Sequence, residues 1–192
     1  MNRESYKEKF FGWRMILAAN FIDFFSAGLA FYAYAVFFGF IQEEFSASRF
    51  LVSITISVLI CSAGVISPFM GFVLDRFPIR RILAIGAILF GSGLILLSTV
   101  KNFTQFLLIY GILVASGMTI FGNLSTAKLI SNWFKEKIGT ALGYASIGLS
   151  MSGVILPPIA VFLISIVGWR NTYLIFGVFV LIVCSILSLR FV

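Results

Sequence analysis

Long apolar runs separated by short charged clusters make up almost the whole chain. A helix needs about 20 predominantly apolar residues to cross a bilayer, and each run approaches or exceeds that length. The runs lack the alternation of barrel strands, and a bilayer leaves any other backbone structure without hydrogen-bond partners. The pattern therefore predicts an all-α membrane protein with six transmembrane helices, at residues 12–41, 51–74, 82–100, 104–132, 138–167 and 172–189.

The segments between these runs are too short to fold alone. We therefore expect one transmembrane domain over residues 1–192, which includes a cytoplasmic N-terminal segment at residues 1–11. The composition agrees, because 60% of the residues are apolar and 11% are charged, whereas soluble domains have about 45–50% and about 25%. This composition excludes a soluble globular domain and an intrinsically disordered chain.

The net charge of +7 is explained by membrane topology. If the N-terminus faces inward, 11 of the 14 lysines and arginines fall in cytoplasmic segments, and only Arg49, Lys101 and Arg170 fall outside. Membrane proteins concentrate these residues on the cytoplasmic side. The sequence thus predicts a multi-pass protein of the cell membrane, plasma or inner, with both termini in the cytoplasm and no role in nucleic-acid binding.

The chain contains no histidine and only two cysteines, Cys61 and Cys184, which lie in separate apolar runs. These absences exclude His-based catalytic triads, most zinc and haem sites and a disulfide framework. A glycine-rich loop of the kind that cradles the phosphates of ATP is absent from the sequence too. We therefore expect neither an enzyme nor a bound cofactor or metal, and expect any transport to be driven by a gradient.

The loop between the second and third predicted helices has the most distinctive local pattern, at residues 71–81. Gly71 lets a neighbouring helix approach closely, Asp75 ends the helix at the membrane surface, and Pro78 forces a tight turn. Three arginines hold this turn at the cytoplasmic face, namely Arg76, Arg80 and Arg81. On spacing alone, the loop is either a specialised turn or an ordinary positive-inside loop in which the acid neutralises one arginine.

This loop resembles the cytoplasmic signature G-x-x-x-D-R-x-G-R-R of the major facilitator superfamily. The matching positions are Gly71, Asp75, Arg76, Arg80 and Arg81. Pro78 stands where the family usually has glycine, and Leu74 where it often has a small residue. In the family, the residues corresponding to Asp75 and Arg76 help to latch two halves of the transporter together, so the resemblance implies a cytoplasmic gating motif.

Three further segments resemble the same family, in particular its monocarboxylate-transporter-like and oxalate/formate-antiporter-like members. Residues 133–143 resemble the W-F-x-x-(K/R)-x-G-x-A-x-G beginning of the fifth helix, and residues 168–170 resemble the G-W-R beginning of the sixth. Residues 67–71 are similar to the end of the second helix. These motifs follow the family's order at the predicted sides of the membrane, so the resemblance covers the whole chain.

The resemblance implies the N-terminal six-helix half of a twelve-helix transporter, built as two inverted three-helix repeats. The chain is then expected to be incomplete and to need a second six-helix half, either as a covalent continuation or as a partner chain. The implied function is secondary active transport by alternating access, as a symporter or antiporter of a small organic anion such as a monocarboxylate, with proton coupling or exchange. The alternative is a non-transporting membrane scaffold or a decayed half-transporter fragment.

Small and polar residues form matching stripes on the first and fourth predicted helices. The first stripe comprises Asn20, Asp23, Ala27, Ala30 and Tyr34, and the second repeats the spacing of its first four members with Ser116, Thr119, Asn123 and Thr126. At about 100° per residue each stripe occupies one side of its helix, and both helices are expected to line a central cavity. The candidates for binding the solute or a proton are Asp23, Asn20, Tyr34, Ser116, Thr119 and Asn123. Packing between helices is the alternative role for the small polar side chains.

Asp23 lies 11 residues after Gly12, about 16 Å along a helix and thus near the middle of the membrane. A carboxylate there costs about 2.5–3.5 kcal/mol on insertion scales unless it is paired, hydrated or protonated. Asp23 therefore either faces a cavity and binds a proton or a cationic part of the substrate, or is a protonated acid hydrogen-bonded to Asn20 or a neighbouring helix. Lys128 either reaches toward the inner headgroups or binds an anion.

The fifth predicted helix is rich in residues that affect helix packing and bending. They are Gly139, Gly143, Gly148, Gly153, Pro157 and Pro158. Glycines permit neighbouring helices to approach closely, and prolines remove backbone donors and bend a helix. These features suit either a helix that takes part in a rocking motion or a kinked helix with a purely structural role.

Overall fold

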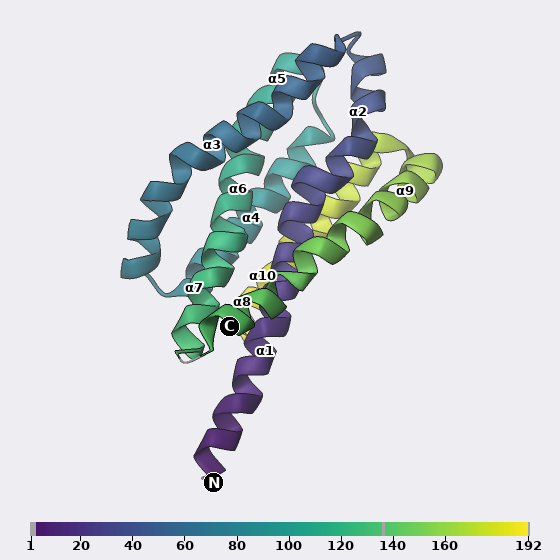
Figure 1. Ribbon diagram of the computed structural model, residues 1–192. Helices are drawn as coiled ribbons and strands as arrows, with labels where there is room; N and C mark the ends of the chain where they lie inside the picture. Colours follow the sequence, from purple (N-terminus) through teal and green to yellow (C-terminus); the bar gives the residue numbers. More distant parts are fainter. Residues whose placement is uncertain (1–2, 136, 192) are drawn as a thin grey trace.

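A computed structural model of the protein describes residues 3–135 and 137–191. Residues 1, 2, 136 and 192 belong to the predicted domain at 1–192, and the first two to the predicted segment at 1–11, but they lie outside the described residues. The described part of the chain contains helices and no strand, which confirms the prediction of an all-α protein. Figure 1 shows a bundle of long helices in which α1 begins and α10 ends toward the same end.

Thirteen helical elements, three of them π-helical turns, form the described part of the chain. In chain order they are α1 (Arg3–Ala27), η1 (Gly28–Tyr32), α2 (Ala33–Glu44), α3 (Arg49–Arg76), α4 (Ile79–Leu97), α5 (Phe103–Ile109), η2 (Tyr110–Val114), α6 (Ala115–Phe121), α7 (Asn123–Trp133), α8 (Ile138–Ala145), α9 (Ile147–Phe179), η3 (Val180–Cys184) and α10 (Ser185–Phe191). Side chains cap two helix starts, because Ser48 accepts a hydrogen bond from the N–H of Leu51 and Asn102 accepts one from the N–H of Gln105.

Five continuous helical segments of the described chain are long and apolar enough to cross a membrane. Four of them correspond to the first four predicted helices, namely Gly12–Glu44, Arg49–Arg76, Ile79–Leu97 and Phe103–Trp133. The fifth, Ile138–Ser188, has 51 residues and covers both of the remaining predicted helices. The apolar runs of the sequence thus correspond to the long helices, although the last two runs are joined.

The sequence predicts a break between the fifth and sixth helices at residues 168–171, and the structure confines this break to one residue. Only Gly168 leaves the helical conformation there, with φ 80° and ψ 163°. A residue without a Cβ adopts this positive φ at little steric cost, so a single glycine can turn the chain. In Figure 1 the ribbon of α9 rises in green and returns in yellow, so the two parts of this element run in opposite directions.

The interior of the bundle is built around α4. Half of the residues in the most apolar 18-residue stretch of α4 are buried, against 17% in that of α3, which lies at the periphery. Close backbone contacts explain this position, because a Cβ added at Gly86 would lie 2.6 Å from the backbone nitrogen of Phe121. A Cβ added at Gly91 would lie 2.9 Å from the carbonyl oxygen of Gly177. Glycines therefore let α4 pack against α6 and α9 at backbone distance.

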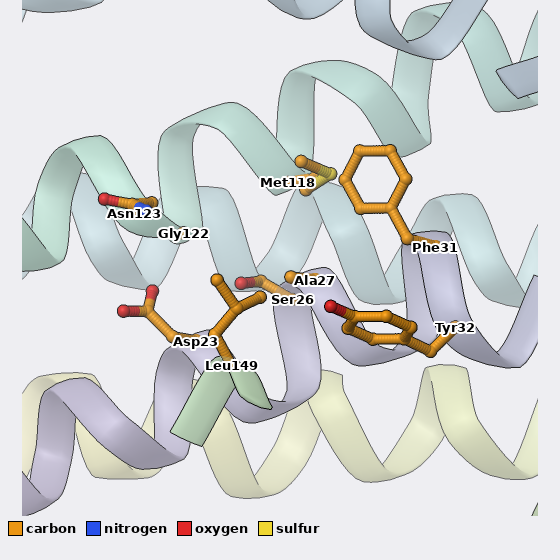
Figure 2. A pocket seen from close by; sticks show the side chains of 9 residues that line it. All are labelled: Asp23, Ser26, Ala27, Phe31, Tyr32, Met118, Gly122, Asn123 and Leu149. Carbon is orange, nitrogen blue, oxygen red and sulfur yellow. The ribbon is translucent and has the colours of Figure 1, made fainter. Parts of the chain in front are cut away.

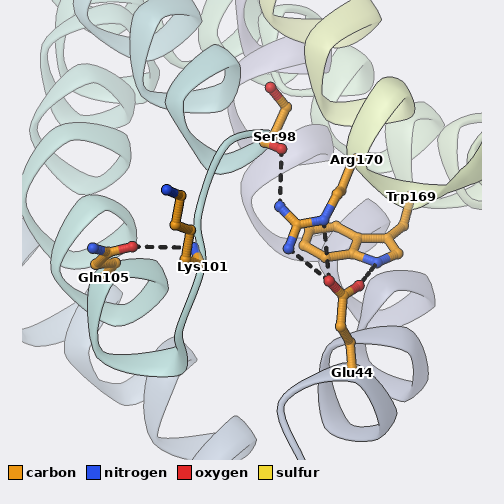
Figure 3. A network of polar contacts seen from close by, with 6 residues as sticks. All are labelled: Glu44, Ser98, Lys101, Gln105, Trp169 and Arg170. Atoms are coloured by element: carbon orange, nitrogen blue, oxygen red, sulfur yellow. Dashed lines mark hydrogen bonds and ion pairs between the residues drawn. The ribbon is translucent and has the colours of Figure 1, made fainter.

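A hydrogen-bonded cluster, drawn in Figure 3, joins three segments at the end of the bundle that lies opposite the α3–α4 turn in Figure 1. The Glu44 carboxylate accepts hydrogen bonds from the Trp169 indole N–H at 2.5 Å and from the Arg170 guanidinium at 2.6 and 3.1 Å. Arg170 also donates to the carbonyl oxygen of Ser98 at 3.0 Å. This Glu44 cluster ties the ends of α2 and α4 to the turn at Gly168.

Replacing Glu44 with alanine is expected to lower the free energy of unfolding by about 1–2 kcal/mol, because charge-assisted hydrogen bonds are lost from a partly exposed site. The matched control is Glu43→Ala, since Glu43 is exposed and its carboxylate takes no part in the Glu44 cluster. Denaturant unfolding in detergent, followed by circular dichroism, measures the difference. Equal shifts for the two variants would show that the cluster does not stabilise the bundle.

Candidate functional site

The Asp23 carboxylate of α1 is buried against α7. It is 6% exposed, and the Thr126 side chain beside it is 2% exposed. The Thr126 hydroxyl lies 3.0 Å from both carboxylate oxygens and donates its one proton to either. Among residues 12–135 and 137–188, whose side chains the structure describes, no lysine or arginine forms an ion pair with Asp23. The carboxylate is therefore held by a neutral hydrogen-bond donor and lacks a cationic partner there.

A cavity of about 390 Å³ lies beside this carboxylate. It is lined by α1, η1, α6, α7, α9 and the residue between α6 and α7, through Asp23, Ser26, Ala27, Phe31, Tyr32, Met118, Gly122, Asn123 and Leu149. Figure 2 shows Asp23 and Asn123 at one end of the cavity and the rings of Phe31 and Tyr32 at the other. The cavity thus has a polar end and an aromatic end, and none of its nine lining residues is cationic.

Two of the six predicted solute-binding or proton-coupling residues, Asp23 and Asn123, line this cavity. The hydroxyls of Ser116 and Thr119 instead donate to carbonyl oxygens of their own helical segment. Gly122 breaks the fourth segment, and the predicted stripe is divided there. Its later part, on α7, meets Asp23, whereas its earlier part, on α6, lies apart from the cavity.

Tyr34 lies away from the cavity because η1 intervenes. Its hydroxyl donates to the carbonyl oxygen of Val52 at 2.8 Å, and its side chain is 2% exposed. A π-helical turn contains more residues than an α-helical turn, so residues beyond it are rotated away from the α-helical phase. Phe31 and Tyr32, which lie within η1, line the cavity although no polar periodicity indicated them. Ser26 could have been found, since it lies one turn after Asp23.

A buried tyrosine joins the two π-helical turns of the first and fourth segments. Tyr110, the first residue of η2, donates its hydroxyl proton to the carbonyl oxygen of Ala30 in η1 at 2.6 Å. Its ring lies 5.0 Å from that of Tyr34, between centroids. The turn that carries Phe31 and Tyr32 into the cavity is therefore held from η2.

Asn20, the remaining predicted candidate, contacts the fifth segment and not the cavity. Its amide group donates to the carbonyl oxygens of Ile16 and Tyr144, both at 2.9 Å, and accepts from the N–H of Gly148 at 2.5 Å. Other glycines of that segment differ in their surroundings. A Cβ at Gly153 would lie 3.2 Å from the Tyr32 ring, whereas a Cβ at Gly139 or Gly143 would have no atom of the described residues within 4 Å.

The predicted cytoplasmic motif lies at the α3–α4 turn. Asp75 forms an ion pair with Lys128 of α7 at 2.7 Å, so its partner is this lysine and not an arginine of its own loop. Both side chains are open to the surroundings, with 69% of Asp75 and 37% of Lys128 exposed. Arg76 lies over the Phe72 ring at 3.9 Å from the centroid, and Gly71 faces open space.

Comparison with known proteins identifies the family. The sequence model of the family described as Major Facilitator Superfamily matches residues 21–192, which is most of the chain and includes every residue that lines the cavity. The chain therefore belongs to the Major Facilitator Superfamily, a family of membrane transporters, and the predicted resemblance is confirmed. It is a multi-pass membrane protein.

The relatives are transporters rather than enzymes. The chain is 32% identical over 136 residues to the uncharacterized MFS-type transporter YcxA of Bacillus subtilis, covering 71% of this chain and 33% of that protein. It is 29% identical to monocarboxylate transporter 6 of Mus musculus, over 78% of this chain and 32% of that transporter. It is also 29% identical to monocarboxylate transporter 1 of Bos taurus, over 90% of this chain and 34% of that transporter. The chain thus spans about a third of the length of these curated relatives.

Replacing Tyr110 with phenylalanine is expected to lower the free energy of unfolding by about 1–2 kcal/mol, because a buried carbonyl loses its donor. Tyr173→Phe is the matched control, since the Tyr173 hydroxyl is buried without a hydrogen-bond partner. We expect this control to be as stable as the wild type or more stable. Chemical denaturation in detergent compares the two, and a larger loss for Tyr173→Phe would contradict the assignment of the Tyr110 hydrogen bond.

Proposed function

We propose that this chain is the N-terminal half of a secondary transporter that moves a small organic anion, such as a monocarboxylate, by alternating access with proton coupling or exchange. Family membership supports transport, and the names of two compared relatives support the substrate class. The observation that carries the proton role is the buried Asp23 carboxylate, which borders a cavity without a cationic partner in the described chain. A non-transporting scaffold remains the alternative function.

Six membrane crossings fit the lengths of the helical segments. The segment Ile138–Ser188 has 51 residues, about 76 Å of helix, whereas the apolar core of a bilayer is about 30 Å thick. Two crossings that meet at the kink of Gly168 account for this excess. The proposed inverted repeat is supported by the first and fourth segments, since each contains a π-helical turn and contributes polar residues to the cavity.

A second six-helix half would complete the cavity and cover the exposed faces of α3, α8 and α9. Gly71, Gly139 and Gly143 have open space at the Cβ position, so another helix can approach their backbones closely. The relatives, about three times as long as the matched region, supply a precedent for such a half. It would be a covalent continuation of this chain or a partner chain.

In this proposal, proton transfer and binding of the carboxylate group of the solute are carried out by different residues. Asp23 takes up and releases a proton, because a carboxylate without a counter-cation is tolerated within a membrane when it is neutral. A cation that grips the carboxylate group of the solute comes from the second half, since none lines the cavity here. Asn123 and Tyr32 offer neutral hydrogen-bonding groups to the same solute.

The charges indicate the orientation in the membrane. Arg76, Arg80 and Arg81 lie at the α3–α4 turn, at the same end as Lys135 and Lys137 between α7 and α8. Under the positive-inside rule this end faces the cytoplasm, and both termini lie on that side of the plasma or inner membrane. The Glu44 cluster then lies at the opposite surface.

Asp23→Asn in the complete transporter is expected to abolish uptake driven by a pH gradient while solute exchange continues, because asparagine keeps the shape but cannot carry the proton. Proteoliposomes assayed with labelled lactate and pyruvate, with and without the gradient, measure both activities. Glu43→Gln serves as the control, since Glu43 is an exposed acid outside the cavity.

Unchanged gradient-driven uptake by Asp23→Asn would refute the proton role. Wild-type protein with both halves present that moves no small solute in this assay would favour the scaffold.

A further inference from the structure

The fifth segment is interrupted between α8 and α9, and a side chain from α1 occupies the interruption. In a continuous α-helix the carbonyl oxygen of Tyr144 would accept a hydrogen bond from the N–H of Gly148, four residues later. In this structure the Asn20 amide lies between them. Its nitrogen donates to the Tyr144 oxygen at 2.9 Å, and its oxygen accepts from the Gly148 N–H at 2.5 Å. The backbone pair is thus bridged by a side chain.

A primary amide suits this position because it contains both an acceptor and two donors, as a peptide group contains both functions. The second donor of Asn20 bonds to the carbonyl oxygen of Ile16 in its own helix at 2.9 Å, which fixes the side-chain orientation. Aspartate of the same shape would lack the donor, and leucine would lack both functions. Both Asn20 donors and its oxygen are engaged, so the amide has no donor left for a solute.

Gly148 completes the arrangement. A Cβ added at this position would collide with the backbone carbonyl group of Asn20, so the two helices meet there at backbone distance. The next residue, Leu149, lines the cavity, and Asp23 follows Asn20 by one helical turn. On both helices, the residues that bridge the interruption therefore lie close to residues that line the cavity.

We propose that Asn20 is a positioning residue that holds the fifth segment open at Ser146. Insertion of a side chain into the hydrogen-bond ladder is a known cause of helix kinks. When α1 moves away from the fifth segment, the Tyr144 carbonyl and the Gly148 N–H bond directly, and α8 and α9 join into one helix. The consequence for transport rests on the proposed function, in which this change links the Asp23 cavity to the bend of the fifth segment.

Asn20→Leu tests the positioning role directly, because leucine has a similar volume and neither donates nor accepts. In lipid bilayers, solid-state NMR reports backbone helicity from the ¹³Cα and ¹³Cβ shifts of residues 144–148. We expect the shifts at Ser146, whose ψ is −8° instead of the helical value of about −42°, to move to those of a continuous helix. Asn171→Leu is the control for the loss of an amide elsewhere, since the Asn171 amide donates to the carbonyl oxygen of Val167 across the kink at Gly168.

Unchanged shifts in Asn20→Leu would overturn the proposal, because the interruption would then be a property of residues 144–148 alone. If that variant does not fold, Asn20→Ala answers the same question, since alanine also leaves the gap unbridged. Closure of the helix in either variant, with the Asn171→Leu shifts unchanged, supports the proposal.

Transport kinetics separate positioning from solute binding. In the complete transporter, Asn20→Leu is expected to lower kcat and leave KM unchanged, because the amide borders no part of the Asp23 cavity. A raised KM with unchanged kcat would overturn the proposal and make Asn20 a solute ligand. Absence of transport by the wild type would refute the proposed function, while the NMR shifts would still decide the role of Asn20.

Discussion

Backbone groups inside a bilayer need hydrogen-bond partners within the protein, and this requirement governs where the helices of this chain can break. Each interruption near the cavity has a side chain that serves it. The Tyr110 hydroxyl donates to Ala30 within η1, and the Asn20 amide bridges α8 and α9. The Ser125 hydroxyl donates to a carbonyl just before Gly122. Many polar residues of the membrane interior are therefore explained by helix geometry before any solute is considered.

The cavity lies beside two of these interruptions, η1 and Gly122. η1 supplies the aromatic end through Phe31 and Tyr32, and the interruption at Gly122 supplies the polar end together with Asn123. Asp23 lies in regular helix between these features and is reached by the Thr126 hydroxyl across the helix contact. The Asp23 carboxylate neither caps a helix nor bridges backbone groups. It differs in this respect from the side chains of Tyr110, Asn20 and Ser125, which hydrogen-bond to backbone groups.

The sequence pattern was sufficient for the helices and insufficient for the phase of their faces. Apolar runs locate long helices because the requirement for about 20 apolar residues acts on every crossing. The predicted stripes assume a constant rotation of about 100° per residue along each helix, and η1 and Gly122 interrupt that regular rotation. Asp23, which precedes η1, lines the cavity, whereas Tyr34, which follows η1, does not. Asn20 also precedes η1, but its amide bonds to the fifth segment instead. The sequence placed the break between the last two helices at residues 168–171, but it does not show that Gly168 alone makes the turn, because a glycine in a sequence does not reveal its positive φ.

The charges at the two ends of the bundle differ in how firmly they are engaged. Glu44 accepts from two neighbouring side chains and joins three segments, so its removal from that cluster would cost several hydrogen bonds. Within the described chain Asp75 pairs with Lys128 alone, and an exposed pair of this kind contributes about 0–1 kcal/mol. A second half of the proposed transporter could therefore capture Asp75 at little cost, but not Glu44. Under the proposed function, exchange of ionic partners during alternating access is therefore expected at the α3–α4 turn.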